Sequence, residues 1–228
     1  MTKQERAVRT RAALIEAAAE LFHRDGFEAT SLATVTARAK VSNGALYFHF
    51  ATKADLADAV AASAAERLAR IVGGGVGVGV GDDAGTDGGS GTRADEPSQG
   101  RELQRLIDVT HAFVRALGSD VVLRAGFDLC GVRERAVVGE DLRDTWREWV
   151  QEALAAAEAR GALAPGVSAR SAAVAVVAGT VGIEVLGAYD EQWLSPDPLT
   201  WFWLLLLPGL AADPGRGELA AAGSGAGR

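Results

Sequence analysis

The sequence predicts an all-α fold, and three observations favour this class over one that contains a sheet. Apolar residues recur at three- and four-residue steps over most of the chain, as they do on one face of an α-helix. Residues suited to helix caps and helix stops separate these segments. Val and Gly alternate at residues 76–80, a pattern that could indicate a strand. Glycine weakens a strand, however, and no partner strand is visible in the sequence. We therefore expect helices throughout.

The first part of the chain predicts a small domain of three helices. Residues 4–24 form an amphipathic pattern that stops at Gly26. Residues 32–39 and 43–49 have room for only about two helical turns each, so neither is stable without packing against its neighbours. We expect these helices to form one compact domain over residues 1–52.

A larger helical domain follows at residues 53–212. Its first helix is expected at residues 53–72, with Thr52 as N-cap. Residues 73–100 are rich in glycine, small residues and acids, so we expect a flexible loop there. Further helices are predicted at residues 101–117, 121–135, 140–160, 168–188 and 197–210, the last with Asp197 as N-cap. Residues 213–228 are expected to be a disordered tail.

Charge is distributed unevenly along the 228 residues, whose formal net charge is −7. Residues 1–53 hold eight basic and five acidic side chains, whereas the remainder holds fifteen basic and twenty-five acidic ones. A basic head on an acidic body is typical of a protein that binds a polyanion with the head alone. Cys130 is the single cysteine, no leader is visible, and the apolar run 201–207 is too short to span a bilayer. We expect a cytoplasmic protein without a membrane span.

Residues 32–50 fit a helix-turn-helix when they are tested position by position. The inward-facing positions of such a motif fall on Val35, Ala39, Val41, Leu46 and His49. Ser42 stands where it can cap the second helix. Asn43 and Gly44 then follow on the exposed first turn, which is the part of a recognition helix that reaches base edges.

The residues Thr30-Ser31-Leu32, followed by Val41-Ser42-x-Gly44-x-Leu46-Tyr47-x-His49-Phe50-x-x-Lys53-x-x-Leu56, resemble the signature of TetR-family regulators. The resemblance implies phosphate contacts by Thr30, Tyr47 and Lys53, and positions at base edges for Asn43, Gly44 and Phe48. The predicted DNA-binding residues are Thr30, Ser31, Ser42, Asn43, Gly44, Tyr47, Phe48, His49 and Lys53.

Some of these positions have another interpretation or depart from the family. Tyr47, Phe48 and Phe50 taken singly suit a hydrophobic core, and His49 faces the core of its own domain. Lys40 stands where the family usually has glycine, and Thr36 where it usually has alanine. A left-handed backbone at Lys40 would cost about 1 kcal/mol.

Within this family, Val122-Leu123-Arg124-Ala125-Gly126 and Trp146-Arg147-Glu148 resemble γ-butyrolactone receptors. That resemblance implies a small effector, a cavity lined by Trp146 and a polar contact from Thr180. Independently, the chain has five tryptophans, which suit either the walls of a ligand cavity or core packing. The predicted ligand-binding residues are Val121, Leu123, Phe127, Trp146, Trp149, Val150 and Thr180. The alternative effector is an antibiotic or another metabolite, as in pseudo-receptor or efflux regulators.

Two segments predict a homodimer. Residues 172–186 are rich in alanine and glycine, which let helices approach closely. Residues 201–207 are apolar on every side and must be covered all round. A two-fold dimer matches the symmetry of a palindromic double-stranded operator. We therefore expect a dimeric repressor that a small ligand releases from its operator.

Enzyme chemistry is the contrasting hypothesis. Glu20-x-x-His23 and Asp108-x-x-His111 have the spacing of a di-iron helical bundle, but such a site needs further inward-facing carboxylates. We find no nucleophile paired with a base, no phosphate-binding loop and no zinc spacing in the sequence. The prediction is a non-enzymatic protein without cofactor or metal, and a helical metalloenzyme is the alternative.

Overall fold

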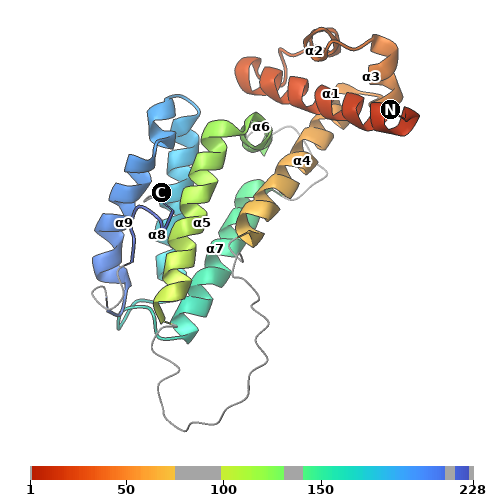
Figure 1. Cartoon of the computed structure of the whole chain (residues 1–228). Helices are drawn as coiled ribbons and strands as arrows, with labels where there is room; N and C mark the ends of the chain where they lie inside the picture. The colour runs from red at the N-terminus through yellow and green to blue at the C-terminus, as the bar shows by residue number, and fades with distance from the viewer. Residues whose placement is uncertain (1, 75–98, 131–140, 214–218, 226–228) are drawn as a thin grey trace, which may run out of the picture. The chain divides into compact units, whose positions relative to one another are not determined.

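The computed structural model describes residues 2–74, 99–130, 141–213 and 219–225, and these ranges are helical almost throughout (Figure 1). The α-helices are α1 (Lys3–Asp25), α2 (Leu32–Ala39), α3 (Asn43–His49), α4 (Lys53–Gly73), α5 (Gln99–Ser119), α6 (Val121–Cys130), α7 (Leu142–Ala159), α8 (Ala169–Gly187) and α9 (Pro196–Leu210). A 3₁₀ helix, η1 (Glu191–Leu194), precedes α9. Within the described ranges, strand pairing amounts to one isolated bridge between Leu163 and Ala211. The all-α prediction is confirmed.

Most helix boundaries agree with the sequence expectations, because they depend on local caps. Thr52 and Asp55 cap α4 reciprocally, each side chain accepting from the other residue's backbone N–H. The predicted N-cap of α9 is wrong by two residues: Ser195 is the N-cap in place of Asp197, so Pro196 is the first helical residue. Of the loop expected at residues 73–100, residues 73, 99 and 100 are helical, and residues 75–98 lie outside the described residues, as do residues 131–135 of the helix predicted to end at 135.

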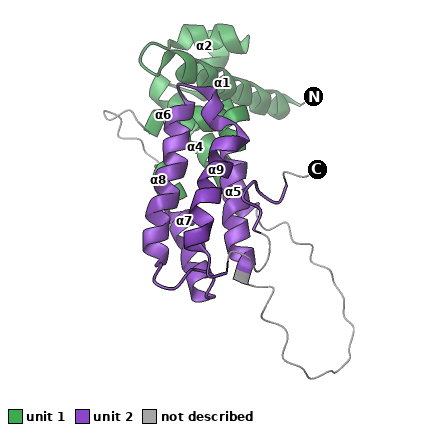
Figure 2. Cartoon of the chain, turned by 90° about the vertical axis from the view of Figure 1, so that its left-hand side faces the viewer, with its two compact units in different colours: residues 1–70, 115–146 green, residues 71–114, 147–228 purple. Residues whose placement is uncertain are grey.

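The described residues separate into two compact units (Figure 2). Unit 1 comprises residues 1–70 and 115–146, and unit 2 comprises residues 71–114 and 147–228. Unit 1 is larger than the predicted head, because α1 packs against α6 as well as against α2 and α3. The predicted boundary of the DNA-binding domain at residue 52 therefore does not coincide with the boundary between the two compact units.

The core of unit 1 explains why α6 belongs with the head. Leu14, Ala18 and Phe22 form the buried face of α1, and Val122 and Leu129 of α6 belong to the same apolar cluster. Also in this unit, α6 approaches α4 closely. A Cβ at Gly126 would lie only 2.3 Å from the Cβ of Ala64, so this crossing requires glycine. Helices α1, α4 and α6 therefore form a fixed support for α3.

Unit 2 is a bundle in which parts of α5 and α7 run alongside α8 and α9 (Figure 2). Trp203 is fully buried, and its Nε1 donates to Thr110 Oγ1 at 2.9 Å. Gly179 of α8 faces the ring of Phe202, and a Cβ there would come within 2.6 Å of it. By length and composition α8 could cross a bilayer, although 39% of its apolar window is buried inside the structure.

Residues 219–225 differ from the expectation of a disordered tail, because they are docked on α5. The Ala221 carbonyl accepts from His111 Nε2 at 2.8 Å, and the Ala220 N–H donates to Gln104 at 2.8 Å. Both polar groups of Ser224 donate to Asp108 at 2.7 Å. This segment has few apolar side chains to bury, so backbone hydrogen bonds to three side chains of α5 hold it in place.

Candidate nucleic-acid interface

The turn between α2 and α3 is built by side-chain caps and one left-handed residue. Ser31 caps α2 by accepting from the Thr34 N–H, and Ser42 caps α3 by accepting from the Ala45 N–H at 3.2 Å. Lys40 closes α2 with φ 56° and ψ 42°, the left-handed conformation that its position as a glycine substitute predicts. These local devices set the direction in which α3 leaves the turn.

Helix α3 presents two faces with different chemistry. Leu46 is fully buried and Phe50 is 4% exposed, which anchors the helix on unit 1. Tyr47 and Phe48 are 61% and 77% exposed, so the alternative that they are core aromatics is wrong for both and correct only for Phe50. Asn43 and Gly44 are exposed on the first turn. The outward face thus combines amide, backbone and aromatic groups, which suits the edges of bases and the sugar-phosphate backbone.

The remaining inward positions of the motif behave as the sequence predicts. Val35 is fully buried, and Ala39 and Val41 are partly buried against the core of unit 1. His49 is half-buried, and its ring lies 5.1 Å from that of Phe48 and 6.2 Å from that of Phe50. Its aromatic neighbours are consistent with a structural role.

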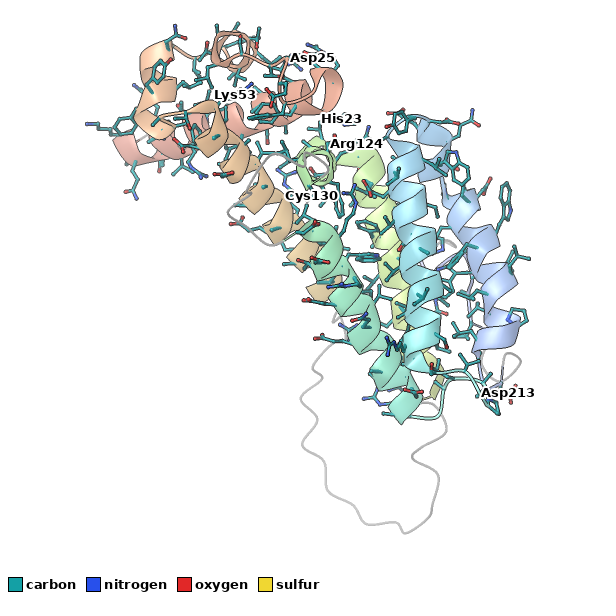
Figure 3. All side chains as sticks on the ribbon, turned by 180° about the vertical axis from the view of Figure 1, so that it is seen from behind. His23, Asp25, Lys53, Arg124, Cys130 and Asp213 are labelled. Carbon is teal, nitrogen blue, oxygen red and sulfur yellow. The ribbon has the colours of Figure 1, made fainter. Side chains whose placement is uncertain are left out.

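Thr30 and Lys53 have interior partners in the structure, although the family resemblance assigns both to phosphates. Thr30 is buried, and its hydroxyl donates to the Gly26 carbonyl at 2.9 Å. Lys53 Nζ donates to the carbonyls of Phe27, Glu28 and Thr30 at 2.9, 3.2 and 3.2 Å, and lies 4.3 Å from the centre of the Phe27 ring (Figure 3). An ammonium has three N–H donors, so these carbonyls use all of them.

Asn43 has a partner that sequence reasoning missed. The Thr36 hydroxyl, on α2, lies 3.0 Å from Asn43 Oδ1 and donates to it. It also lies 2.9 Å from the Ala33 carbonyl. The sequence marked Thr36 only as a departure from alanine, because a contact across seven residues depends on the angle between the two helices.

A second polar contact joins α1 to α6 within unit 1 (Figure 3). His23 Nδ1 lies 2.7 Å from Asp128, and His23 Nε2 lies 3.2 Å from an amino nitrogen of Arg124. A guanidinium can only donate, so Nε2 accepts and Nδ1–H donates to Asp128. Arg124 also donates to the carbonyls of Leu117 and Gly118. The histidine therefore holds the head against α6.

The predicted ligand-binding residues divide between the two units. Leu123, Phe127 and Trp146 are buried in unit 1. Val121, also in unit 1, packs against the core cluster that includes the head, which is a structural role. In unit 2, Val150 and Thr180 are fully buried, Trp149 is half-buried, and the Thr180 hydroxyl donates to the Val176 carbonyl at 2.8 Å.

A pocket of about 590 Å³ lies on unit 2 beside η1 and α9. None of the predicted ligand-binding residues lines it. Its lining includes Trp193, Pro198, Trp201, Phe202 and Leu205. Trp201 and Leu205 are exposed apolar residues of α9, so this pocket lies on the outer surface of that helix. It gives no support to the predicted effector site.

The residues considered for metal chemistry make other contacts. Glu20 pairs with Arg38, His23 with Asp128, and Asp108 and His111 with the segment 219–225. Among the described residues, no group of three or more His, Cys, Asp or Glu side chains could hold a metal ion. Burial raises the pKa of the Cys130 thiol, which keeps it from being a ready nucleophile.

Comparisons with known proteins agree with this geometry. The family model for bacterial regulatory proteins of the tetR family matches residues 14–60. The A-factor receptor protein of Streptomyces griseus is 28% identical over 215 residues, which cover 92% of this chain and 67% of the relative.

Solved structures extend the likeness over nearly the whole chain. A γ-butyrolactone receptor described as ArpA-like has a TM-score of 0.74 at 28% identity, covering 95% of this chain and 96% of its own. The TetR-family protein CprB from Streptomyces coelicolor A3(2) has a TM-score of 0.71 at 30% identity, covering 95% and 97%. CprB in complex with its biological operator sequence has a TM-score of 0.66, covering 90% of each chain. The chain belongs to the TetR family of bacterial transcriptional regulators, and within it resembles the γ-butyrolactone receptors.

Proposed function

We propose that this regulator is a repressor that binds a palindromic operator as a homodimer and leaves it when a small signalling ligand, such as a γ-butyrolactone, binds. The observation that carries the proposal is the outward face of α3, where Asn43, Gly44, Tyr47 and Phe48 are exposed on a helix whose opposite side is anchored in the core. The relative CprB, solved with its operator, supports the same use of this chain.

The roles of the DNA-binding residues follow from their exposure. Asn43, Gly44 and Phe48 are proposed to lie at base edges in the major groove, and Tyr47 to contact a phosphate. Ser31 and Ser42 cap the N-termini of α2 and α3, where free backbone N–H groups favour a phosphate. Thr30 and Lys53 contribute by holding the loop between α1 and α2, since their polar groups already bond to its carbonyls.

The homodimer is proposed to form through α8 and α9. These helices expose several large apolar side chains: Val174, Val185, Leu186, Trp201, Leu204 and Leu205. An exposed patch of large apolar side chains marks an interaction surface. A second copy of the chain is the partner whose two-fold symmetry also matches a palindrome. In this proposal the long apolar sequence of α8 serves the dimer interface. The proposal also places the protein in the cytoplasm, where its operator DNA lies.

The effector is proposed to bind near Trp146, in the part of the chain that resembles γ-butyrolactone receptors. Trp146, Leu123 and Phe127 are buried apolar side chains of unit 1, and Val150 and Thr180 are buried in unit 2. An apolar ligand with one or two polar groups suits such surroundings. Nothing in this mechanism requires catalysis, a metal or a cofactor, because binding energy alone shifts the equilibrium between the DNA-bound and released states.

The DNA-binding part is tested by gel shift with duplexes from the upstream region of the protein's own gene. We expect a salt-sensitive complex, because phosphate contacts release counterions. Phe48→Ala should weaken the specific complex at least tenfold, which corresponds to about 1.4 kcal/mol. Phe48 is exposed, so the melting temperature of the variant serves as the folding control. A protein that binds no upstream duplex at any salt concentration would refute the proposal.

The ligand part is tested by release of that complex with a panel of γ-butyrolactones, antibiotics and unrelated metabolites. Trp146→Phe should weaken release by the active compound without changing operator affinity. Coupling is reciprocal, so saturating operator DNA should weaken ligand binding by the same factor. Equal ligand affinities with and without operator contradict the mechanism. Release by an antibiotic alone would favour the alternative regulator class.

A further inference from the structure

Thr36 and Asn43 form a contact between the two helices of the helix-turn-helix that fixes a side chain on the DNA-facing surface. Thr36 is 5% exposed and lies on α2, whereas Asn43 is exposed and begins α3. The hydroxyl proton is shared between Asn43 Oδ1 at 3.0 Å and the Ala33 carbonyl at 2.9 Å, as in a three-centre hydrogen bond. The amide oxygen of Asn43 therefore faces α2, and its NH₂ group faces outward.

We infer that Thr36 is a specificity-determining residue that acts through Asn43, by holding the amide with its N–H donors toward the bases. The inference rests on the proposed use of α3 in the major groove. Asparagine pairs with adenine by presenting its oxygen and its nitrogen together. Here the oxygen is turned to Thr36, so only donors remain outward. Guanine matches them, because its major-groove edge offers the acceptors N7 and O6.

The contact also explains why a polar residue is tolerated at a buried helix crossing. A threonine hydroxyl within a helix bonds to a preceding carbonyl, and Ala33 supplies it, so burial of Thr36 leaves no unsatisfied group. The bond to Asn43 is additional, and it limits the rotamers of an exposed side chain before DNA arrives. An ordered side chain loses less entropy on binding, which favours the base that fits its fixed orientation.

The experiment measures dissociation constants for a set of operator half-sites in which each base pair is varied in turn. The proteins are wild type, Asn43→Ala, Thr36→Val, which removes the hydroxyl at nearly constant shape, and Thr36→Ser, which keeps it. Thr36→Ala, with the residue usual in the family, replaces Thr36→Val if the valine variant fails to fold. Melting temperatures and affinity for an unrelated duplex are recorded for every protein.

We expect wild type to prefer a guanine-containing pair at one position, and Asn43→Ala to lose that preference. Thr36→Val should lose about fivefold in discrimination at the same position, equivalent to about 1 kcal/mol, with unchanged affinity for unrelated DNA. Thr36→Ser should retain the preference, and a double variant that combines Thr36→Val with Asn43→Ala should be no less selective than Asn43→Ala alone.

Three results would overturn the inference. The first is an equal loss on all duplexes with Thr36→Val, which a merely structural role would give. The second is a change at a position that Asn43→Ala leaves untouched. The third is a preference for adenine at the Asn43 position, which requires the amide oxygen to face the base. Failure of the proposed function is separate from all three, because wild type would then bind no half-site.

Discussion

Helices α3 and α9 both expose large aromatic side chains, but the surfaces around those side chains differ. On α3, Phe48 is 77% exposed, and the polar residues Asn43 and Ser42 are exposed at the start of the same short helix. On α9, Trp201 is 61% exposed beside Leu204 and Leu205, which are 57% and 85% exposed. The first surface can satisfy hydrogen-bonding groups of a partner, whereas the large side chains of the second cover apolar area.

This contrast shows that exposure of an aromatic ring does not by itself identify its partner. The α3 surface is small and held by local caps, which suits a rigid element that enters a groove. On α9 the exposed large side chains are apolar, and polar residues such as Asp190 and Asp197 border Trp201 and Leu205 in the pocket, which resembles the apolar core and polar rim of a protein interface. The two surfaces should therefore respond to different substitutions.

The largest effect is expected from Leu205→Asp on α9. A carboxylate at the centre of the apolar surface would have to be buried unpaired in the dimer, so the variant should be monomeric. Loss of the second head removes bivalent binding, which should lower operator affinity by about 100-fold or more. Size-exclusion chromatography with light scattering and gel shifts measure the two effects.

The matched control is Ala155→Asp, which adds the same charge at an exposed position of α7. It should leave both oligomeric state and operator affinity unchanged. If Leu205→Asp stayed dimeric, α9 would not be the dimer surface and the contrast with α3 would lose its basis.

An intermediate effect is expected from Lys53→Met, which tests how α3 is supported. The variant keeps the apolar stem but leaves three loop carbonyls without their ammonium donor. Hydrogen bonds to a charged group contribute about 1.5–3 kcal/mol, and the partly exposed loop should place the loss near the lower end. Urea unfolding of the full chain measures it.

A phosphate contact by Lys53 would produce a different pattern. The free energy of unfolding would then be unchanged, and the slope of log affinity against log salt would fall by about 1. That outcome would restore the role implied by the family resemblance and remove the structural one argued above.

The helices and the recognition surface could be predicted because their determinants are local. Ser42, Thr52 and Gly26 act within a few residues of themselves, and the order of the signature from Thr30 to Leu56 defined the motif. The sequence marked Lys40 only as standing where the family usually has glycine, with a cost if its backbone were left-handed, and the structure has it left-handed.

The features that could not be predicted depend on residues that meet only after folding. Lys53 finds its carbonyls 23 to 26 residues away, and Ser224 finds Asp108 across 116 residues. The spacing of apolar residues along the sequence does not indicate which distant polar residues will meet in such pairs. The ligand site stays a prediction for the same reason: the sequence identifies Trp146 and Val121 as apolar residues, but it does not show that Val121 packs against the cluster that supports the head.

A smaller effect, of opposite sign, is expected from Lys40→Gly. A left-handed non-glycine residue costs about 1–2 kcal/mol, and the greater chain entropy of glycine when unfolded offsets about half of this. The variant should therefore be more stable by roughly 0.5–1 kcal/mol in urea unfolding. Lys40→Ala removes the same charge and keeps the strain, so it should show no gain. A gain with alanine as large as with glycine would attribute the effect to charge.

The smallest effect concerns the support behind α3 and depends on pH. Burial alone would raise the pKa of Asp120, but the hydrogen bond from Arg67, the backbone N–H groups of Leu123 and Val122, and the charge of Arg67 together hold it below its ordinary value of 3.8. A carboxyl whose pKa is lower in the folded state stabilises the fold above its unfolded pKa and loses that contribution as pH falls through the folded value.

Asp120→Asn should therefore be less stable than wild type at pH 7, and the difference should shrink below about pH 4 as the wild-type carboxyl becomes protonated. Both partners are partly exposed, so solvent screens the pair and the difference should stay small. Urea unfolding at several pH values measures it. Asp120 also accepts from backbone N–H groups at the start of α6, and asparagine caps a helix about as well as aspartate, so a difference that stays constant across the pH range would contradict a contribution from the carboxylate charge.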